Sequence, residues 1–201
     1  MKVKIVSQEE KSMVTLYKKE PDGKLLYAEY WIEEGQVVEH IGTVGTHGTT
    51  SRADLPETYN HENEFKSDFL KRFSDQGYEE ASQQYSYVLL IQYPMKSMTG
   101  TKRDLWLKDK ASEALISELG WRGLGIVDGH DMGKTANPIT EFALNIYCYV
   151  VDEKLGIQTI KRVLKETRLD YTRIKIASRE LKNDGEYILK YAAKKAQEFY
   201  V

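Results

Sequence analysis

The order of β-type and helical segments after residue 84 constrains the fold of this chain more than any other feature. Segments rich in β-branched and aromatic residues predict strands, and four of them lie at residues 85–93, 121–129, 141–151 and 171–178. Apolar residues at helical spacing predict two helices between them, at residues 104–120 and 154–167. The order is therefore strand, helix, strand, strand, helix, strand.

This order is that of the split βαβ arrangement, so we predict a ferredoxin-like sandwich in which two helices pack on one antiparallel sheet. A further amphipathic pattern at residues 186–200 predicts an extra C-terminal helix. Tyrosines such as Tyr147 and Tyr149 alternate along the strands and would share one face of the sheet. We expect the C-terminal helix to bury that face; a homodimer interface is the second interpretation, and stacking of nucleic-acid bases is the third.

The first half of the chain predicts a smaller domain, a small antiparallel sheet with one helix. Its β-type runs are separated by short turn signals and lie at residues 3–7, 13–19, 25–33 and 37–45. A helix is predicted from Glu62 to Asp75, because phenylalanines recur along it at helical spacing. A polar connector at residues 79–84 follows. We therefore predict an α+β protein with two domains, at residues 1–80 and 85–201.

A glycine-rich stretch, EHIGTVGTHGTTS at residues 39–51, follows the last strand pattern of the first half. Three glycines recur along it at positions 42, 45 and 48. We interpret them as backbone devices that allow positive φ angles and the close approach of chain segments. They need no bound phosphate to account for them.

Residues 12–80 resemble a WGR domain, a module that occurs in poly(ADP-ribose) polymerases and in various bacterial proteins. The resemblance rests on a hairpin, the glycine-rich stretch and a helix that ends near a Gly-Tyr pair, with matches at Gly42, Val44, Gly45, Gly48, Phe69, Phe73, Gly77 and Tyr78. The tripeptide Trp-Gly-Arg, which names the family, is replaced here by Ile41-Gly42-Thr43. The resemblance implies nucleic-acid contact and interdomain signalling at the arginine position, and Thr43 lacks the charged, planar fork of an arginine.

The charge of the first half also argues against a polyanionic partner. Residues 1–84 hold 10 basic and 16 acidic residues, a balance of −6, whereas the rest of the chain holds 19 and 15, a balance of +4. Contacts to phosphate dominate nonspecific nucleic-acid affinity, so an acidic surface opposes it. The polar residues that we predict as contacts to a partner are Thr43, Thr46, His47, Arg52, Lys71 and Arg72.

The stretch VDGHDMGKT at residues 127–135 nearly matches the P-loop pattern. The pattern requires glycine where this chain has Asp128, and it requires a helix where the sequence continues with ANPIT and a strand. The acidic and histidine side chains are of metal-ligand type, but three ligands within four residues rarely complete a coordination sphere. We therefore predict a long hairpin turn with no cofactor and no metal. A ligand site is the alternative, at Asp128, His130, Asp131 and Lys134.

The remaining features favour a binding protein over an enzyme. Motifs for nucleophilic or zinc-dependent catalysis, such as Gly-x-Ser-x-Gly and His-Glu-x-x-His, do not occur. The single cysteine, Cys148, excludes an internal disulfide and suits a reducing compartment. We see no signal peptide and no apolar run of membrane length.

We therefore predict a cytoplasmic regulatory protein of bacterial type that acts through protein–protein interaction, with a partner protein or a second copy and without a membrane. The first alternative is a nucleic-acid-binding protein that uses the WGR-like domain. The second alternative is a nucleotide- or metal-dependent enzyme centred on residues 128–135.

Overall fold

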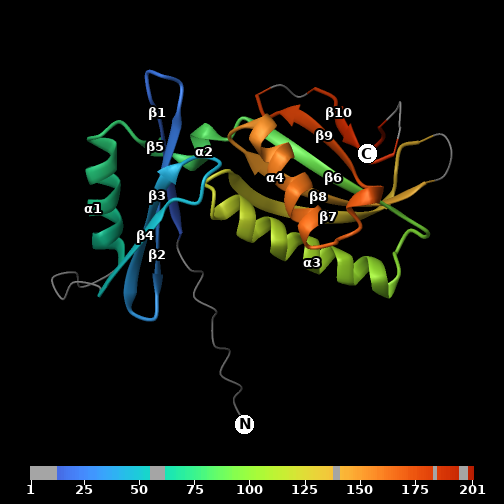
Figure 1. The fold of residues 1–201 in the computed structure, drawn as a ribbon, viewed down its shortest axis with the longest axis horizontal. Helices are drawn as coiled ribbons and strands as arrows, with labels where there is room; N and C mark the ends of the chain where they lie inside the picture. Colours follow the sequence, from blue (N-terminus) through green and yellow to red (C-terminus); the bar gives the residue numbers. More distant parts are fainter. Residues whose placement is uncertain (1–12, 55–61, 138–140, 183–184, 195–198) are drawn as a thin grey trace, which may run out of the picture. The chain divides into compact units, whose positions relative to one another are not determined.

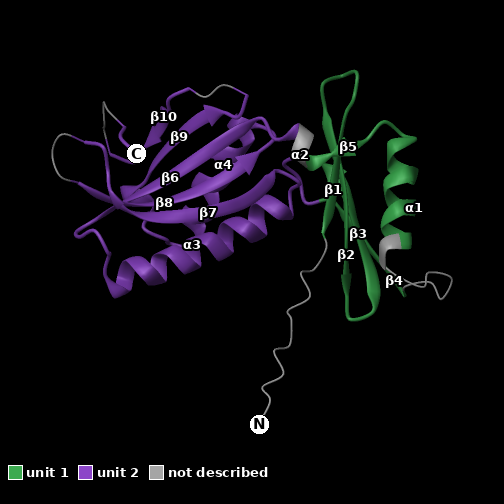
Figure 2. Cartoon of the chain, turned by 180° about the vertical axis from the view of Figure 1, so that it is seen from behind, with its two compact units in different colours: residues 1–43, 48–81 green, residues 44–47, 82–201 purple. Residues whose placement is uncertain are grey.

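The computed structural model describes residues 13–54, 62–137, 141–182, 185–194 and 199–201. The chain divides into two compact units, which comprise residues 1–43 with 48–81 and residues 44–47 with 82–201 (Figure 2). Each unit contains one antiparallel sheet and helices (Figure 1). The predicted α+β class is therefore confirmed. Residues 44–47 belong to the second unit, although they lie between two strands of the first.

The first unit contains a five-stranded sheet in the order β4-β3-β2-β1-β5. The strands are β1 (Val14–Lys19), β2 (Leu25–Glu33), β3 (Gln36–Thr43), β4 (Thr49–Asp54) and β5 (Glu79–Glu80). The predicted helix is present as α1 (Glu62–Ser74), and it packs on the sheet over a core of Leu16, Ala28, Tyr30, Phe69, Phe73 and Tyr78. The predicted strand at residues 3–7 lies outside the described residues. Strand β4 was not predicted, because its polar sequence TTSRAD is exposed along its whole length.

A two-residue turn joins β2 to β3 and fixes their register. Glu34 and Gly35 have positive φ angles of 53° and 78°, which is the geometry of a type I′ hairpin turn. The register that results places Glu29 of β2 directly opposite His40 of β3. Paired residues of an antiparallel sheet point to the same face, so the turn brings these two polar side chains together.

The second unit contains a five-stranded sheet in the order β10-β9-β6-β8-β7. The strands are β6 (Tyr87–Met95), β7 (Gly125–Lys134), β8 (Phe142–Val150), β9 (Lys175–Glu180) and β10 (Ile188–Ala192). Two long helices, α3 (Lys102–Gly120) and α4 (Glu153–Glu166), cover one face of this sheet (Figure 1). The short elements are α2 (Ala81–Gln84) and the 3-10 helix η1 (Tyr171–Arg173). The chain order β6-α3-β7-β8-α4-β9 confirms the predicted order of elements, whereas the finer ferredoxin-like assignment stays a prediction.

Both long helices begin at side-chain caps and bury one apolar side. Thr101 caps α3 and forms a capping box with Asp104, while Asp152 accepts a hydrogen bond from the first turn of α4. The predicted inward face of α3 is confirmed, with buried Leu107, Ala111, Leu115 and Leu119. Among the described helices, none is long and apolar enough to cross a membrane.

The predicted C-terminal helix at residues 186–200 is wrong. Residues 188–192 form β10, which pairs antiparallel with β9, and residues 195–198 lie outside the described part of the chain. The edge of β9 offers backbone N–H and C=O groups that an added strand satisfies, and these tertiary hydrogen bonds override a helical pattern in the sequence. Near the chain end, the backbone O of Tyr200 accepts a hydrogen bond of 2.9 Å from Nε2 of Gln92.

The predicted hairpin turn at residues 127–135 is also wrong. Strand β7 continues to Lys134 and pairs with β8, with one irregularity between Val127 and Gly129. Such a bulge inserts one extra residue and bends a strand without ending it. Gly and Asp disfavour strands locally, so the ladder with β8 explains why the sequence pattern was misleading.

Candidate functional site

Two glycines of the glycine-rich stretch, Gly42 in β3 and Gly48 before β4, lie at a close approach of two backbone segments in the first unit. A Cβ atom on Gly42 would lie 2.7 Å from the Cα of Gly48, and a Cβ atom on Gly48 would lie 2.3 Å from the backbone O of Ile41. These distances exclude any side chain. At position 45 glycine is required by the backbone conformation, since the φ angle of Gly45 is 90° and other residues rarely adopt that conformation. Both predicted backbone roles of the glycines are confirmed, the close approach of chain segments at Gly42 and Gly48 and the positive φ angle at Gly45.

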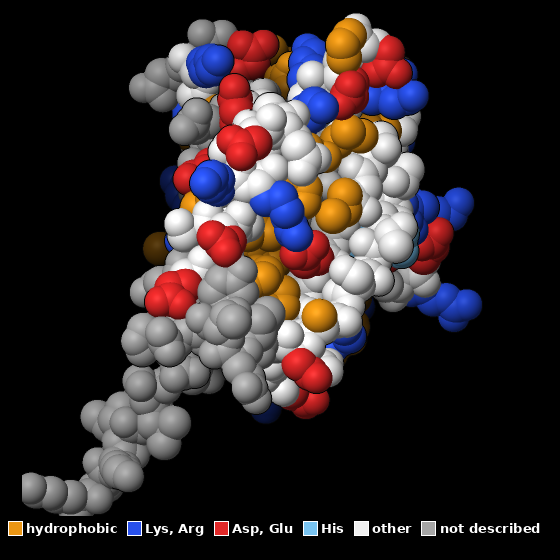
Figure 3. All heavy atoms as spheres, turned by 90° about the vertical axis from the view of Figure 1, so that its left-hand side faces the viewer, with side chains coloured by type: hydrophobic (Ala, Val, Ile, Leu, Met, Phe, Trp, Pro, Cys, Tyr) orange, Lys and Arg blue, Asp and Glu red, His pale blue; other side chains and the backbone are white. Residues whose placement is uncertain are grey.

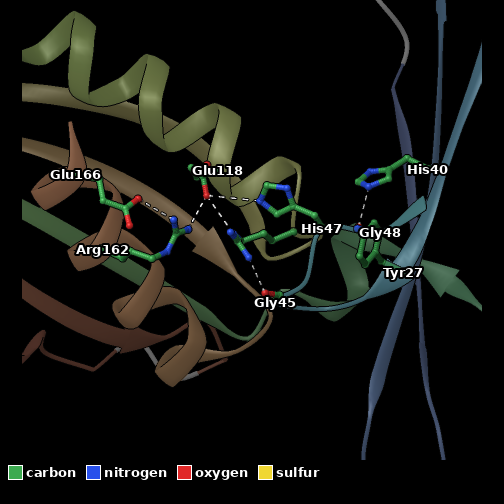
Figure 4. A network of polar contacts seen from close by, with 9 residues as sticks. Tyr27, His40, Gly45, His47, Gly48, Glu118, Arg162 and Glu166 are labelled. Carbon is green, nitrogen blue, oxygen red and sulfur yellow. Dashed lines mark hydrogen bonds and ion pairs between the residues drawn. The ribbon is translucent and has the colours of Figure 1, made fainter. Parts of the chain in front are cut away.

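A chain of buried hydrogen bonds reaches this loop within the first unit (Figure 4). Nδ1 of His40 lies 2.7 Å from Oε1 of Glu29, and Nε2 of His40 lies 2.9 Å from the hydroxyl of Tyr27. The same hydroxyl accepts a hydrogen bond of 2.8 Å from the N–H of Gly48. A neutral His40 that carries its proton on Nδ1 satisfies every contact, because it donates to Glu29 and accepts from Tyr27.

The burial of this relay gives it a structural role. Carboxylate, imidazole and hydroxyl in series are also the parts of a nucleophilic triad, but Tyr27 is 0% exposed and His40 only 1% exposed. A substrate therefore has no access to the hydroxyl, which Gly48 and His40 already occupy. Burial raises the pKa of Glu29, and the hydrogen bond from His40 offsets part of that rise. The relay fixes β2 and β3 to the start of β4.

Residues 44–47 take part in a second polar network, which lies within the second unit (Figure 4). The N–H of Gly45 donates to the backbone O of Arg122 at 2.8 Å, and Nη1 of Arg122 donates back to the O of Gly45 at 3.0 Å. Glu118 of α3 accepts hydrogen bonds from Arg122 at 3.0 Å and from Arg162 of α4 at 2.5 Å. The network therefore ties this short segment to both long helices.

Glu118 is the centre of that network. Burial by itself would raise the pKa of Glu118, but the hydrogen bonds from Arg162 and Arg122 outweigh it and lower the pKa below its usual value. The candidate residue His47 lies at the rim, with Nε2 4.0 Å from Oε2 of Glu118 and a side chain that is 58% exposed. Thr46 is in the same segment and is exposed.

The candidate arginines of the first unit already have carboxylate partners. Arg52 of β4 pairs with Glu33 at 3.2 Å, and Arg72 of α1 forms an ion pair with Glu39 of β3. A phosphate group would have to compete with both carboxylates. Thr43 ends β3 and is half-buried, so these candidates do not form one free basic surface.

The face that carries α1 is mixed in charge. Figure 3 shows basic, acidic and hydrophobic side chains interspersed over its described part. A pocket of about 380 Å³ lies along α1, and its charged lining consists of Asp68, Lys71, Arg72 and Asp75. Two acidic and two basic side chains cancel, so this pocket offers no net attraction for a polyanion.

The four candidate residues of β7 do not converge on one site. An extended strand rises about 3.3 Å per residue, so Asp128 and Lys134 lie roughly 20 Å apart. Asp131 accepts hydrogen bonds from Nδ2 of Asn145 at 2.8 Å and from the hydroxyl of Tyr147 at 2.5 Å. Within the described ranges, no group of three His, Cys, Asp or Glu side chains could hold a metal ion. Asp131 therefore holds two side chains of the neighbouring strand β8 by hydrogen bonds.

The outer face of α3 carries exposed hydrophobic residues that the sequence analysis did not single out. Leu105, Trp106 and Ile116 are 46%, 43% and 57% exposed. The guanidinium group of Arg103 stacks on the ring of Trp106 at 4.2 Å. Trp106 also borders a groove of about 410 Å³, which is lined further by Lys110, Glu113, Ala114, Thr167 and Leu169.

Comparison of the chain with protein-family models, with curated proteins and with solved structures finds no match. The resemblance to the WGR domain therefore stays a prediction. The case for a function rests on the geometry of the chain's own residues.

Proposed function

We propose that this protein acts without catalysis, as an interaction protein that binds a second copy of itself through the outer face of α3. The observation that carries the proposal is the exposure of Leu105, Trp106 and Ile116 on one helix. Several large hydrophobic side chains exposed along one helix favour an interaction surface. Tryptophan and arginine are also enriched among the residues that dominate interface energies, and here Arg103 stacks on Trp106.

Two pairs of oppositely charged side chains lie along α3. Lys110 lies 2.6 Å from Glu113, and Lys108 lies 3.0 Å from Asp109. Exposed pairs of this kind contribute little to stability, but they leave the face close to neutral. A neutral surface with hydrophobic anchors favours a protein partner over a polyanion.

The spacing of the hydrophobic residues favours an antiparallel pair of α3 helices, related by a twofold axis. Leu105 and Ile116 lie equally far from the midpoint between positions 110 and 111. They also lie on the same side of the helix, because 11 residues complete about three turns. Leu105 of one copy would therefore face Ile116 of the other. The same register places Asp109 opposite Ser112, whereas a parallel pair would bring two Asp109 carboxylates together.

The tyrosine face of the second sheet is a weaker candidate for the dimer interface. Gln92 on this face donates hydrogen bonds to Asn145 and to the backbone of Tyr200. Tyr147 donates to Asp131. Since these polar groups are satisfied within the unit, they offer a second copy few contacts.

The two alternative functions have less support. Nucleic-acid binding through Arg52 and Arg72 would require phosphates to displace Glu33 and Glu39. An enzyme centred on residues 128–135 would require side chains that converge, but those side chains follow an extended strand. For the same protein we infer a cytoplasmic location, which the lone, buried thiol supports.

Sedimentation equilibrium from about 1 µM to about 1 mM protein tests the proposal, since this range covers weak to moderate association. We expect the average mass to rise from monomer to dimer. Ile116→Ser should raise the dissociation constant by roughly tenfold, or about 1.4 kcal/mol, because it removes an apolar contact made twice in the dimer. Ile188→Ser is the matched control, since Ile188 is 62% exposed on β10, and it should leave the constant unchanged. A monomer at every concentration contradicts the proposal, as does an equal effect of both substitutions.

A further inference from the structure

A pocket of about 410 Å³ lies at one end of the second sheet, where β6 ends and β8 and β9 begin. It shares no lining residue with the α3 groove, so it is independent of the proposed dimer. Its volume falls in the range of pockets that hold small organic ligands. The lining of the pocket includes Gln92, Lys96, Thr135, Phe142, Arg173 and Lys175.

The rim of this pocket is basic. Among the described lining residues, Lys96, Arg173 and Lys175 are basic and Glu141 is acidic, which leaves a formal balance of +2. Among the described residues, neither Lys96 nor Lys175 forms an ion pair or a side-chain hydrogen bond with another residue. Two ammonium groups that form no ion pair among the described residues, at one concave site, attract an anion more strongly than scattered surface lysines do.

The third cation is positioned by the backbone. Nη2 of Arg173 donates to the carbonyl O of Pro94 at 3.3 Å, and Nη1 lies 3.9 Å from Oδ2 of Asp170. Asp170 also pairs with Arg103 at 2.9 Å, so it neutralises Arg173 only in part. A guanidinium group held in this way presents its remaining N–H groups in a fixed fork that suits carboxylate or phosphate oxygens.

The inner wall of the pocket combines polar and apolar groups. Gln92 and Thr135 are 5% and 6% exposed, and the side-chain amide of Gln92 is held by Asn145 at 3.1 Å. Phe142 adds an aromatic surface beside them. A ligand that matches this wall and the basic rim carries a negative charge at one end and a flat apolar body at the other.

We propose that this pocket binds a small organic anion, either a carboxylate or a phosphate ester with an apolar body. Lys96, Arg173 and Lys175 contact the charged group, and Phe142 contacts the apolar body. The proposal concerns binding only, and no bond is formed or broken.

NMR titration of the full-length, ¹⁵N-labelled protein tests this site. The anionic probes are benzoate and phenyl phosphate, and the controls are benzylamine and sodium chloride at matched ionic strength. We expect saturable shifts centred on the side-chain amide of Gln92 and on the backbone amides of Lys96, Ala143 and Lys175. Tighter binding of benzoate assigns the site to carboxylates, and tighter binding of phenyl phosphate assigns it to phosphate esters.

Substitutions separate this site from nonspecific attraction by lysines. Lys96→Gln and Lys175→Gln should each weaken binding of the anionic probes by roughly threefold, and the double variant by roughly tenfold, because each removes one charged contact at the rim. Lys165→Gln, at an exposed position of α4, is the matched control and should bind as the wild type does. The proposal is overturned if neither anion gives saturable shifts, if sodium chloride gives the same shifts, or if the Lys165 variant weakens binding equally.

Discussion

Nδ1 of His40 lies 2.7 Å from Oε1 of Glu29, and both side chains are buried in the first unit. Through Tyr27 the imidazole also reaches the glycine-rich loop, whose Gly48 donates to the Tyr27 hydroxyl. Because the relay is buried, loss of His40 takes one hydrogen bond from Glu29 and one from Tyr27 that water does not readily replace.

Replacing His40 by alanine should lower the free energy of unfolding of the first unit by about 3 kcal/mol. The substitution opens a cavity and removes the shorter of two hydrogen bonds to the buried Glu29, which leaves the contact of 3.3 Å from the Thr15 hydroxyl. Native-state hydrogen exchange of the β2 and β3 amides measures this loss within one unit, which matters because a protein of two units need not unfold in one step. The control is His47→Ala, at a side chain that is 58% exposed, with an expected loss below about 0.5 kcal/mol. Similar exchange in the two variants would argue against the relay.

Gly48→Ala should destabilise the first unit by about 3 kcal/mol or more, because the new methyl group would meet the backbone O of Ile41 at 2.3 Å. Gly133→Ala in β7 is the matched control, since a Cβ atom added there would meet nothing within 4 Å beyond its own chain neighbours. Thermal unfolding followed by circular dichroism compares the two variants. If Gly48→Ala melts as the wild type does, the two chain segments do not approach each other as described.

Glu118 should make the stability of the second unit depend on pH. Its pKa is lowered in the folded state, so the carboxylate contributes stability that is present above the unfolded value, about 4.5, and lost as the pH falls through the folded value. Glu118→Gln should therefore reduce stability at pH 7 and flatten its decline below about pH 4.5. Hydrogen exchange of α3 and α4 amides between pH 7 and pH 3 measures this. Glu166→Gln, at a side chain that is 60% exposed, should keep the wild-type pH dependence, and a loss of that dependence in the control would contradict the assignment to Glu118.

Local periodicity predicted those elements whose burial follows from their own sequence. Leu107, Ala111, Leu115 and Leu119 recur at helical spacing, and α3 buries these four residues. The same spacing places Leu105 and Ile116 on another side of the helix, so the sequence pattern was sufficient to predict their exposure. The prediction for residues 188–192 was wrong because their conformation depends on hydrogen bonds to the edge strand β9, and the spacing of their own apolar residues does not report that pairing.

The polar sites were less predictable, because they depend on contacts between distant segments. Gly45 and Arg122 bond reciprocally although 77 positions separate them. The basic pocket joins Lys96 at the end of one strand to Lys175 at the start of another. Arg52 and Arg72 were chosen as candidates by residue type, which does not show that both already pair with carboxylates.

Cysteine cross-linking between the proposed partner helices tests the central claim most directly. Within one chain, positions 105 and 116 are 11 residues apart, or about 16 Å along α3, and a disulfide needs Cα atoms within about 7 Å. The native Cys148 is buried and is common to all variants. We predict that a mixture of the Leu105→Cys and Ile116→Cys proteins forms disulfide-linked dimers under mild oxidation much faster than either protein alone. A mixture that stays monomeric, or that cross-links no faster than each variant by itself, would contradict antiparallel association through α3.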